Sequence, residues 1–592
     1  MKLSISLIIH FWTVLVFAHV EYPNYGAPLP RFLPYANSKP GVAPWGDRTS
    51  KNTDPYLGTP STGMTRKYKF TLSRSKIAPD GFNKDVILVN GQFPGPMIEA
   101  NWGDWIEVDL INNITSPEEG AAIHWHGLQQ RETPWMDGVP GISQCAIAPN
   151  KQMKYRFRAD RYGTSWYHSH YSSQYVDGIT GAMVIYGPDH VDFEVDLGPV
   201  LLHDWRHESY EAVNEEVMRV RLQDIVNIPK LLGLLPIASA NLINGKGAYN
   251  NCGSTEAKNC SSGWKRQLQT LNFEKGKRYK LRLANVGGDG TQKFGIDGHN
   301  LTVVATDYTQ IEPYETNIVT LAVGQRSDVI VTATGNDGES FWARSRVAWC
   351  SLTWQGEAMA MVRYPKADLT LEPKSKAQVD NSSWCAGDPL PLSKPYYPMD
   401  AEEPTTIRTF NTFYTINSTG HLMFSFNFPE TFKGNYSTPL LSKANQGIAS
   451  QKWSSFDQVY DFASNQTIRV VLNNPTYMQN AHAIHLHGHD MMVLAEGTGN
   501  WDEKTLNLKN PIRRDTQIVV PNGHIVFQYK ADNPGLWPFH CHIPWHVSDG
   551  LVMNFLEHPD KVRSLSTIPS AMKQTCSEWE DWVRGRFLPD QN

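Results

Sequence analysis

Four His-x-His patterns are the residues whose types and spacing could do chemistry. They stand at His124/His126, His168/His170, His485/His487 and His540/His542. Residues i and i+2 of a β-strand point to the same face, so each pattern presents two imidazoles side by side. Eight imidazoles suffice for three metal ions with room for an oxygen ligand, and imidazole suits copper well. The patterns therefore predict a site for three copper ions.

The fourth pattern contains a cysteine, Cys541, which must face away from its two neighbours on a strand. His546, five residues later, and His482, three before His485, could complete a second site with it. Such a His₂Cys set is the blue-copper arrangement for electron transfer. Leu551, ten residues after Cys541, cannot donate to copper, which should raise the potential relative to a methionine ligand. The spacing predicts single electrons passing from Cys541 to its neighbouring histidines, and then to dioxygen.

Simpler interpretations explain less of this pattern. A lone histidine in a strand is usually structural, and a zinc site needs only three or four ligands. His489, after Gly488, is interpreted as a neighbour of the ligands, and His203 as structural.

Alternating residues predict that strands position these histidines. Apolar and polar residues alternate in 106–110, 279–283 and 525–530, as in half-buried strands. Helical spacing is limited to 572–583 and to a possible stretch at 209–232. The fold class is therefore predicted as all-β, with antiparallel sandwiches or barrels.

The 592 residues suggest three domains, placed at 60–190, 195–370 and 400–565, with a helical tail at 566–592. The Pro-rich segment 388–404 is a candidate linker, and 27–44 a candidate extended arm. Net charge is -5 without a basic run, which argues against a nucleic-acid partner.

The N-terminus predicts secretion. Lys2 and the apolar stretch 3–17 resemble a signal peptide of residues 1–18, too short to span a membrane comfortably. Seven glycosylation motifs agree with that route: Asn113, Asn259, Asn300, Asn381, Asn417, Asn435 and Asn465. The expected location is extracellular or the cell wall.

Seven cysteines leave one unpaired in a secreted chain, and Cys541 is that one. The other six could form the pairs Cys252–Cys260, Cys350–Cys385 and Cys145–Cys576. This connectivity is a hypothesis.

The four histidine segments resemble the copper-binding motifs of the multicopper oxidases, and ascomycete-type laccases most closely. The similarity runs through nearly the whole chain after residue 60, including 90–96 and the segment 162–175. It implies three Greek-key cupredoxin domains, four copper ions and one-electron oxidation of phenolic substrates coupled to reduction of dioxygen to water. A monomer is expected.

The resemblance also implies a role for each ligand. His482, Cys541 and His546 would hold the type 1 copper, and His124 with His485 the type 2 copper. The type 3 pair would take His126, His168, His170, His487, His540 and His542. Of the catalytic residues, His546 would take the substrate electron, Cys541 would pass it on, and Asp137 would assist proton delivery.

Four departures from the family pattern stand out. Ala483 replaces a proline after the first histidine of the third motif, and Pro544 stands where some relatives carry a relay acid. Ser239 occupies the position where laccases often place the acid that accepts the phenolic proton. The tail 589–592 lacks the usual processed ending. The missing acid suggests a narrow substrate, such as a polyketide pigment precursor.

Other functions remain open. A ferroxidase would need carboxylates beside the type 1 histidines, and ascorbate oxidases carry methionine at the position of Leu551. A copper store or carrier without catalytic activity would not need a blue site joined to a three-copper cluster.

Overall fold

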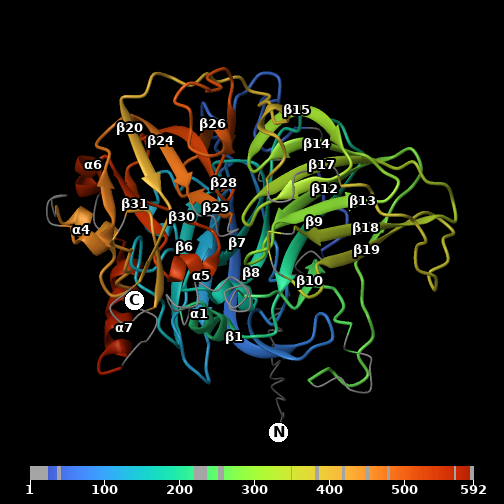
Figure 1. The fold of residues 1–592 in the computed structure, drawn as a ribbon, viewed down its shortest axis with the longest axis horizontal. Coiled ribbons are helices and arrows are strands. Elements are labelled where there is room, and N and C mark those ends of the chain that lie inside the picture. Colours follow the sequence, from blue (N-terminus) through green and yellow to red (C-terminus); the bar gives the residue numbers. More distant parts are fainter. Residues whose placement is uncertain are drawn as a thin grey trace, which may run out of the picture.

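The computed structural model describes residues 25–586 except 36–41, 219–235, 251, 253–258, 349, 352, 381–385, 417–420, 428, 448–452, 476–480 and 566–568. Strands dominate this part of the chain and form pairs of packed sheets that follow one another in sequence (Figure 1). The predicted signal peptide lies outside the described residues. The predicted domain limits stay a prediction.

The first pair of sheets has the strand orders β2-β1-β4-β6 and β3-β8-β7-β5. Its strands are β1 (Thr65–Ile77), β2 (Lys84–Val89), β3 (Ile98–Asn101), β4 (Trp105–Asn112), β5 (Ile123–Trp125), β6 (Lys151–Arg158), β7 (Gly163–Ser169) and β8 (Thr180–Tyr186). The alternation predicted at 106–110 is confirmed, since Ile106, Val108 and Leu110 of β4 point into the core.

The second pair, at the right in Figure 1, has the orders β10-β9-β12-β17-β14-β15 and β11-β19-β18-β13-β16. Its strands are β9 (Val195–Trp205), β10 (Ala240–Ile243), β11 (Thr270–Asn272), β12 (Arg278–Asn285), β13 (Gln292–Ile296), β14 (Leu301–Thr306), β15 (Thr309–Thr316), β16 (Val319–Leu321), β17 (Arg326–Thr332), β18 (Ser340–Val347) and β19 (Glu357–Arg363).

The third pair has the orders β20-β24-β29-β26-β27 and β23-β31-β30-β25-β28, beside the small sheet β21-β22. Its strands are β20 (Thr406–Asn411), β21 (Phe413–Ile416), β22 (Leu422–Ser425), β23 (Val459–Asp461), β24 (Thr467–Asn474), β25 (His482–Leu486), β26 (Met491–Thr498), β27 (Ile512–Arg514), β28 (Thr516–Val519), β29 (Gly523–Lys530), β30 (Gly535–Cys541) and β31 (Val552–Glu557).

Helices are short and few among the described residues. They are α1 (Tyr210–Met218), α4 (Leu440–Asn445), α5 (Pro544–Ser548), α6 (Pro559–Ser564) and α7 (Ser570–Val583), with 3₁₀ turns η1 (Pro134–Met136), η2 (Gln174–Asp177), η3 (Leu390–Leu392) and η5 (Ser455–Asp457). The helix predicted at 572–583 is confirmed as α7. The stretch predicted at 209–232 is helical in α1, and its remainder falls outside the description. None of the helices described is long and apolar enough to cross a membrane.

Two strands predicted to be half-buried are buried on both faces. In β12, Lys280 and Arg282 are covered, and Arg282 donates to Asp196 at 2.7 Å and contacts Thr164 of β7 at 3.1 Å. The outer face of this sheet therefore packs on the first pair of sheets, and ion pairs compensate the buried charges. In β29, the polar Gln528 is likewise covered. Its side-chain amide donates to the carbonyl of Glu402 and accepts a hydrogen bond from Nε of Arg469. The prediction of an exposed face was wrong for both strands.

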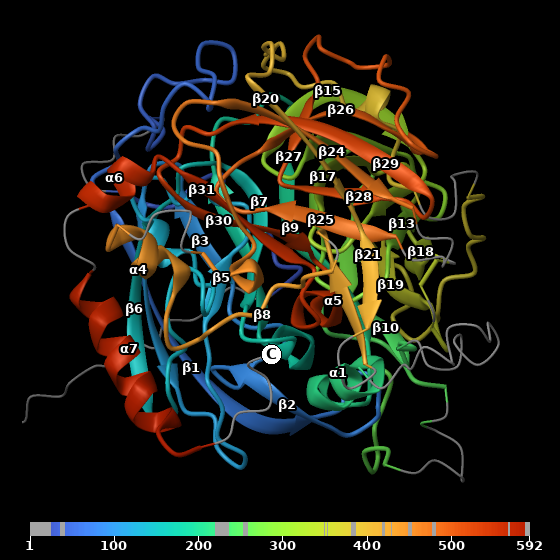
Figure 2. The ribbon, with the colours of Figure 1, turned by 60° about the vertical axis from the view of Figure 1, so that its left-hand side comes forward.

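Two contacts tie the chain ends to the body. The disulfide Cys145–Cys576 fixes α7, the helix that lies beside β6 in Figure 2. The disulfide Cys252–Cys260 closes a local loop. Two of the three predicted disulfides are therefore present. The third, Cys350–Cys385, cannot be compared because Cys385 lies outside the described residues. In the Pro-rich arm, the backbone N–H of Leu33 donates to Asn101 Oδ1 of β3 at 2.8 Å. The arm therefore packs on the first pair of sheets.

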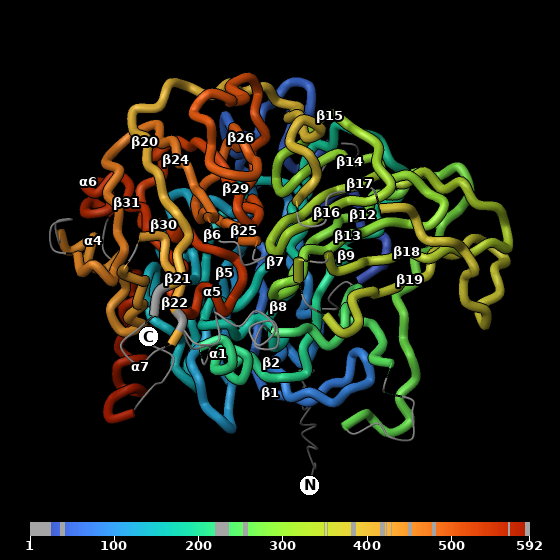
Figure 3. The backbone as a smooth tube through the Cα atoms, viewed as in Figure 1, coloured from blue at the N-terminus to red at the C-terminus, as the bar shows by residue number. Residues whose placement is uncertain are grey.

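The largest core joins the first and third pairs of sheets. Its buried members extend from Phe70 and Trp125 to Cys541 and Phe555, whereas the second pair has a core centred on its own strands. The tube in Figure 3 shows β5 and β7 of the first pair near β25 and β30 of the third. All four His-x-His patterns lie on or directly after these strands.

Candidate metal centre

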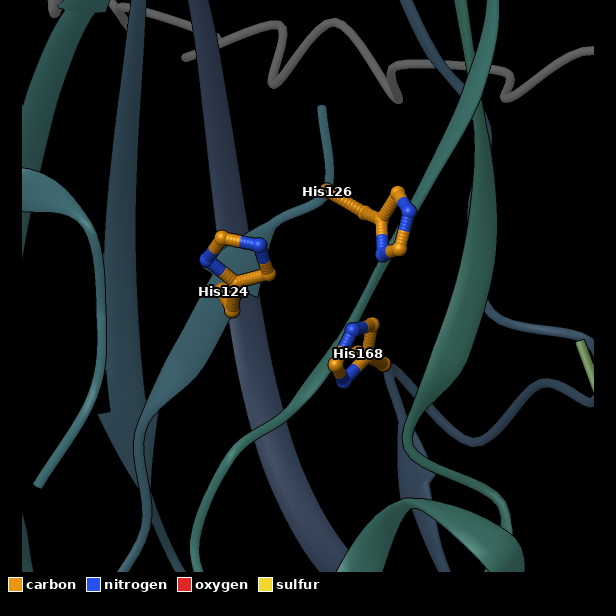
Figure 4. A group of neighbouring side chains, drawn as sticks. All are labelled: His124, His126 and His168. Atoms are coloured by element: carbon orange, nitrogen blue, oxygen red, sulfur yellow. The ribbon is translucent and has the colours of Figure 1, made fainter. Parts of the chain in front are cut away.

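The first two His-x-His patterns meet because β5 and β7 pair antiparallel. His124 and His168 are direct partners in this register, so their side chains share one face. His126 and His170 follow the two strands at once. Figure 4 shows the rings of His124, His126 and His168 turned toward a common space.

The other two patterns meet through β25 and β30. His485 is the direct partner of His540, and Ile484 is the partner of Cys541. The two histidines therefore lie on one face of β30 and the cysteine on the other. This register agrees with the alternation argued from the sequence.

The eight imidazoles come together between the first and third pairs of sheets. Nε2 of His487 lies 2.9 Å from Nε2 of His540, and Nε2 of His542 lies 3.1 Å from Nδ1 of His126. Ring nitrogens lie within 4.8 Å of one another in the sets His124/His126/His168, His124/His485/His487 and His170/His487/His540. Each set has the size and donor type of a metal site.

Backbone carbonyls orient several of these rings. Nδ1–H of His124 donates to the carbonyl of Asp137 at 2.7 Å, and Nδ1–H of His485 to the carbonyl of Asp515 at 2.8 Å. His168 donates in the same way to Ser169 at 3.0 Å. The opposite nitrogen, Nε2, is buried in all three rings without a hydrogen-bond partner among the described residues. A bound metal would satisfy these nitrogens, and the tethered Nδ1–H is the usual partner of such a ligand.

Two carboxylates complete the cluster. Asp137 Oδ2 accepts from Nδ1 of His487 at 2.8 Å. Asp515 Oδ1 accepts from Nε2 of His126 at 3.0 Å. The guanidinium of Arg326 in β17 donates two hydrogen bonds of 2.6 Å to the Asp515 carboxylate. All five side chains are buried. Asp137 therefore contacts the cluster as predicted, and Asp515 is a contact that the sequence reasoning missed.

Burial keeps most of these imidazoles neutral. Loss of solvation, followed by the neighbouring imidazoles, lowers the pKa of His126, His168, His485, His487 and His542 well below its ordinary value. For His540 the pKa falls to about 4, again mainly through burial. Neutral imidazole is the form that binds a metal.

The triad His482, Cys541 and His546 lies on the other side of β30. Its ligand atoms lie within 4.8 Å of one another, and Cys541 Sγ is 3.5 Å from Nδ1 of His546. Both ring nitrogens of His482 are buried without a partner among the described residues. Burial raises the pKa of the Cys541 thiol, and the charge of Asp289 adds to this to a lesser degree. A thiol held in so apolar a place needs a cation to ionise, and copper is the ion that a His₂Cys set selects.

The surroundings of the triad differ from the sequence-based expectation in one respect. Ser239 is buried, and its hydroxyl accepts from the backbone N–H of His207 at 3.2 Å. One acid whose charge reaches the Cys541 thiol is Asp289, whose side chain keeps 23% exposure and lies 3.7 Å from Arg206. Burial raises the pKa of Asp289 to about 7. The guanidinium of Arg206 lies 4.3 Å from the ring of Trp545, the residue before His546.

Sequence reasoning missed Asp289 and Asp515 for the same reason. Each stands in a segment remote from the histidine patterns, and an acid in a turn has no local mark of burial. His489 pairs with Glu557 at 2.9 Å and packs against the ring of Tyr529, so its interpretation as a neighbour of the ligands stays a prediction.

Family comparison places the chain without ambiguity. Three models described as multicopper oxidase match residues 71–190, 196–367 and 426–561. The chain is 38% identical to oxidoreductase OpS5 of Beauveria bassiana, over 90% of this chain and 88% of that protein. It is 35% identical to laccase-2 of Botryotinia fuckeliana, with 93% and 91% covered, and 32% identical to dihydrogeodin oxidase of Aspergillus terreus, with 92% of each covered.

The fold comparison agrees. The crystal structure of the laccase from Botrytis aclada superposes with a TM-score of 0.83 at 31% identity, covering 93% of this chain and 97% of that one. The predicted all-β fold of three cupredoxin-like domains is thereby confirmed, and the donor sets fit the copper ions of the family. The chain belongs to the multicopper oxidases.

Proposed function

We propose that this protein is a secreted laccase-type oxidase that removes single electrons from a phenolic substrate at His546 and reduces dioxygen to water. The observation that carries the proposal is the two-sided use of β30. Cys541 faces the triad, while His540 and His542 face the imidazole cluster. Covalent bonds of one strand thus link an electron-accepting site to an oxygen-reducing one.

We assign the ligands as follows. The type 1 site takes His482, Cys541 and His546, and the type 2 site takes His124 and His485. The type 3 pair takes His126, His168, His170, His487, His540 and His542. The tethered Nδ1–H groups and the close ring pairs support this division. When bound, four copper ions would supply one-electron acceptance on one side of β30 and four-electron reduction of dioxygen on the other.

The protein's own groups prepare both sites. The Asp137 carboxylate holds the proton on Nδ1 of His487, which keeps Nε2 free. The Asp515 carboxylate holds the proton on Nε2 of His126, which keeps Nδ1 free. A cavity of about 50 Å³ beside His170, lined by Val139, Tyr436 and Ser548, offers a path for dioxygen and water. Elsewhere the cluster is closed by buried side chains, which limits escape of partly reduced oxygen.

On the substrate side, we propose Asp289 as the acceptor of the phenolic proton in place of Ser239. Its partial exposure, its closeness to Arg206 and Trp545, and its pKa near 7 suit a general base at neutral pH. A phenol that gives up its proton as it loses an electron avoids a high-energy radical cation. Ser239 cannot take that proton.

Iron oxidation is the alternative that the position of Asp289 raises. A ferroxidase holds Fe(II) on carboxylates beside the type 1 histidines, and Asp289 is such a carboxylate. However, Asp289 is a single carboxylate and is already paired with the Arg206 guanidinium at 3.7 Å, which makes it a poor ligand for Fe(II). The site therefore favours a neutral organic substrate. Similarity to dihydrogeodin oxidase supports our narrower proposal of an aromatic secondary metabolite.

Secretion and a monomeric state are also proposed. The described asparagines of the glycosylation motifs, at 113, 259, 300, 435 and 465, are all exposed, as attachment of a glycan requires.

The test is oxygen uptake by purified holoprotein with a panel of reductants. We expect turnover with a simple methoxyphenol, faster turnover with a polycyclic naphthol, and little with Fe(II). Faster Fe(II) oxidation than phenol oxidation would replace the proposal by a ferroxidase. Copper binding without oxygen uptake on any reductant would indicate a store or carrier.

A further inference from the structure

The guanidinium of Arg206 has donors left over. Its side chain is only 3% exposed, and NH1 donates to Asp204 Oδ2 at 2.7 Å. Nε and NH2 are buried without a hydrogen-bond partner among the described residues, and NH2 lies 3.7 Å from Asp289 Oδ2, too far for a hydrogen bond. Burying charged N–H groups unpaired is costly, so two such donors on one side chain indicate an acceptor that binds there.

These donors stand close to the triad. Arg206 packs over the ring of Trp545, the residue before His546. Gly288 lies close to both side chains. A Cβ added to Gly288 would lie 3.0 Å from Trp545 and 3.3 Å from Arg206, so a side chain here would crowd this contact. Asp289, the next residue, is partly exposed and marks the solvent side. A ligand that enters past Asp289 therefore meets Arg206 beside Trp545.

The charges around Arg206 decide what kind of acceptor fits. Asp204 already neutralises the guanidinium, and it also accepts the backbone N–H of Gly288 at 2.7 Å. Asp289 adds a second carboxyl group at 3.7 Å, and Glu216 of α1 is close enough for Arg206 to lower its pKa, although burial raises that pKa more. With one cation among three acids, a carboxylate ligand would be repelled, whereas a neutral carbonyl oxygen accepts the free N–H groups without that cost.

We propose that Nε and NH2 of Arg206 bind the carbonyl oxygen of a phenolic ketone or ester and hold its ring beside Trp545 and His546. This inference rests on the proposed function, because it names the substrate class for the same site. It makes Arg206 a specificity-determining residue: ring phenols with a carbonyl substituent are preferred over the parent phenols and over phenolic acids.

The test separates binding from turnover by using ligands that cannot be oxidised as phenols. Isothermal titration of the holoprotein compares 3,4,5-trimethoxyacetophenone, 1,2,3-trimethoxybenzene and 3,4,5-trimethoxybenzoate. We expect the ketone to bind about tenfold more tightly than either other ligand, the value of one charge-assisted hydrogen bond. Substitution R206L should erase this preference, and R206K should keep part of it. The control R586L removes a surface guanidinium over Trp582, 4.7 Å from its ring, and should change nothing.

The outcomes are distinct. Equal affinity of the wild-type protein for all three ligands means that water holds the donors, and it overturns the proposal even if R206L does not fold. If R206L loses affinity equally for all three ligands, Arg206 only supports Trp545, and the proposal is also overturned. Oxygen uptake by the wild type with 2,6-dimethoxyphenol is measured in parallel. Its absence would defeat the proposed function while leaving a ketone preference intact as a binding result.

Discussion

The two faces of β30 carry sites that are built in different ways. On the cluster face, each ring of His124, His168 and His485 is fixed by a backbone carbonyl. On the triad face, His482 has no hydrogen-bond partner on either nitrogen among the described residues, and His546 stands on the short helix α5. The centroid of the His546 ring lies 4.3 Å from that of the Phe424 ring. Polar tethers thus hold the cluster, while apolar packing holds the triad.

This difference matches the proposed division of work. Oxygen reduction needs several ligands held in a fixed relation, whereas electron acceptance needs one site close to the substrate. The cluster should therefore respond to loss of a single hydrogen bond, and the triad to loss of a ligand or of the contacts that position α5. Four substitutions test this distinction.

The largest effect is expected from C541S. Loss of the thiolate should remove the intense thiolate-to-copper absorption and abolish phenol turnover, because the triad loses its metal and its link to the cluster. Copper analysis should still find the three cluster ions. The control L551M alters the buried neighbour of the triad and should keep the colour. Retained colour in C541S would contradict the assignment.

D289N should lower kcat/KM for phenols on the order of 10²-fold at pH 8, the usual scale of a general base. The carboxyl has a pKa of about 7, so it accepts protons above that pH and is protonated below it. In the wild type, phenol turnover should therefore rise as pH passes through 7, and D289N should flatten this rise. The control D337N removes an acid of 51% exposure. A D289N profile with the same rise would exclude Asp289 as the base.

D137N acts on the cluster face only. Losing the carboxylate that holds His487 should reduce cluster copper affinity or oxygen uptake roughly 10–100-fold, the range for such supporting contacts. The blue absorption of the triad should stay, as should binding of a redox-inert ligand. The control D109N alters an exposed acid of β4. A loss of blue colour in D137N would mean that the two faces are not separate.

The smallest effect is expected from N214L. Asn214 of α1 bonds Ser173 at 2.8 Å and Ser172 at 3.2 Å, and Ser173 bonds Ser548 of α5 at 2.9 Å. Removing the Asn214 hydrogen bonds should lower the free energy of unfolding by about 1 kcal/mol. It should also shift the absorption spectrum of the triad slightly, because α5 is held less firmly. The cluster should be unaffected, and A212L on the exposed side of α1 serves as control. An altered cluster spectrum with an unchanged triad would reverse the comparison.

Much of the site could be predicted because it obeys a local rule. The alternation of side chains on a strand depends only on sequence spacing, so His540, Cys541 and His542 could be divided between two faces without a structure. The acids that contact the site from other segments could not be predicted in this way. Asp515 meets His126 only through packing of the first and third pairs of sheets, and Asp289, our proposed proton acceptor, lies in a different segment from Ser239. The covered face of β12 was missed for the same reason, since its partner is another sheet.

The most direct test of the account is a crystal structure of the holoprotein with anomalous scattering measured at the copper edge. The account predicts one copper between His482, Cys541 and His546, and three among the eight imidazoles on the opposite face of β30. Copper on only one face, or fewer than three ions in the cluster of an active preparation, would contradict it.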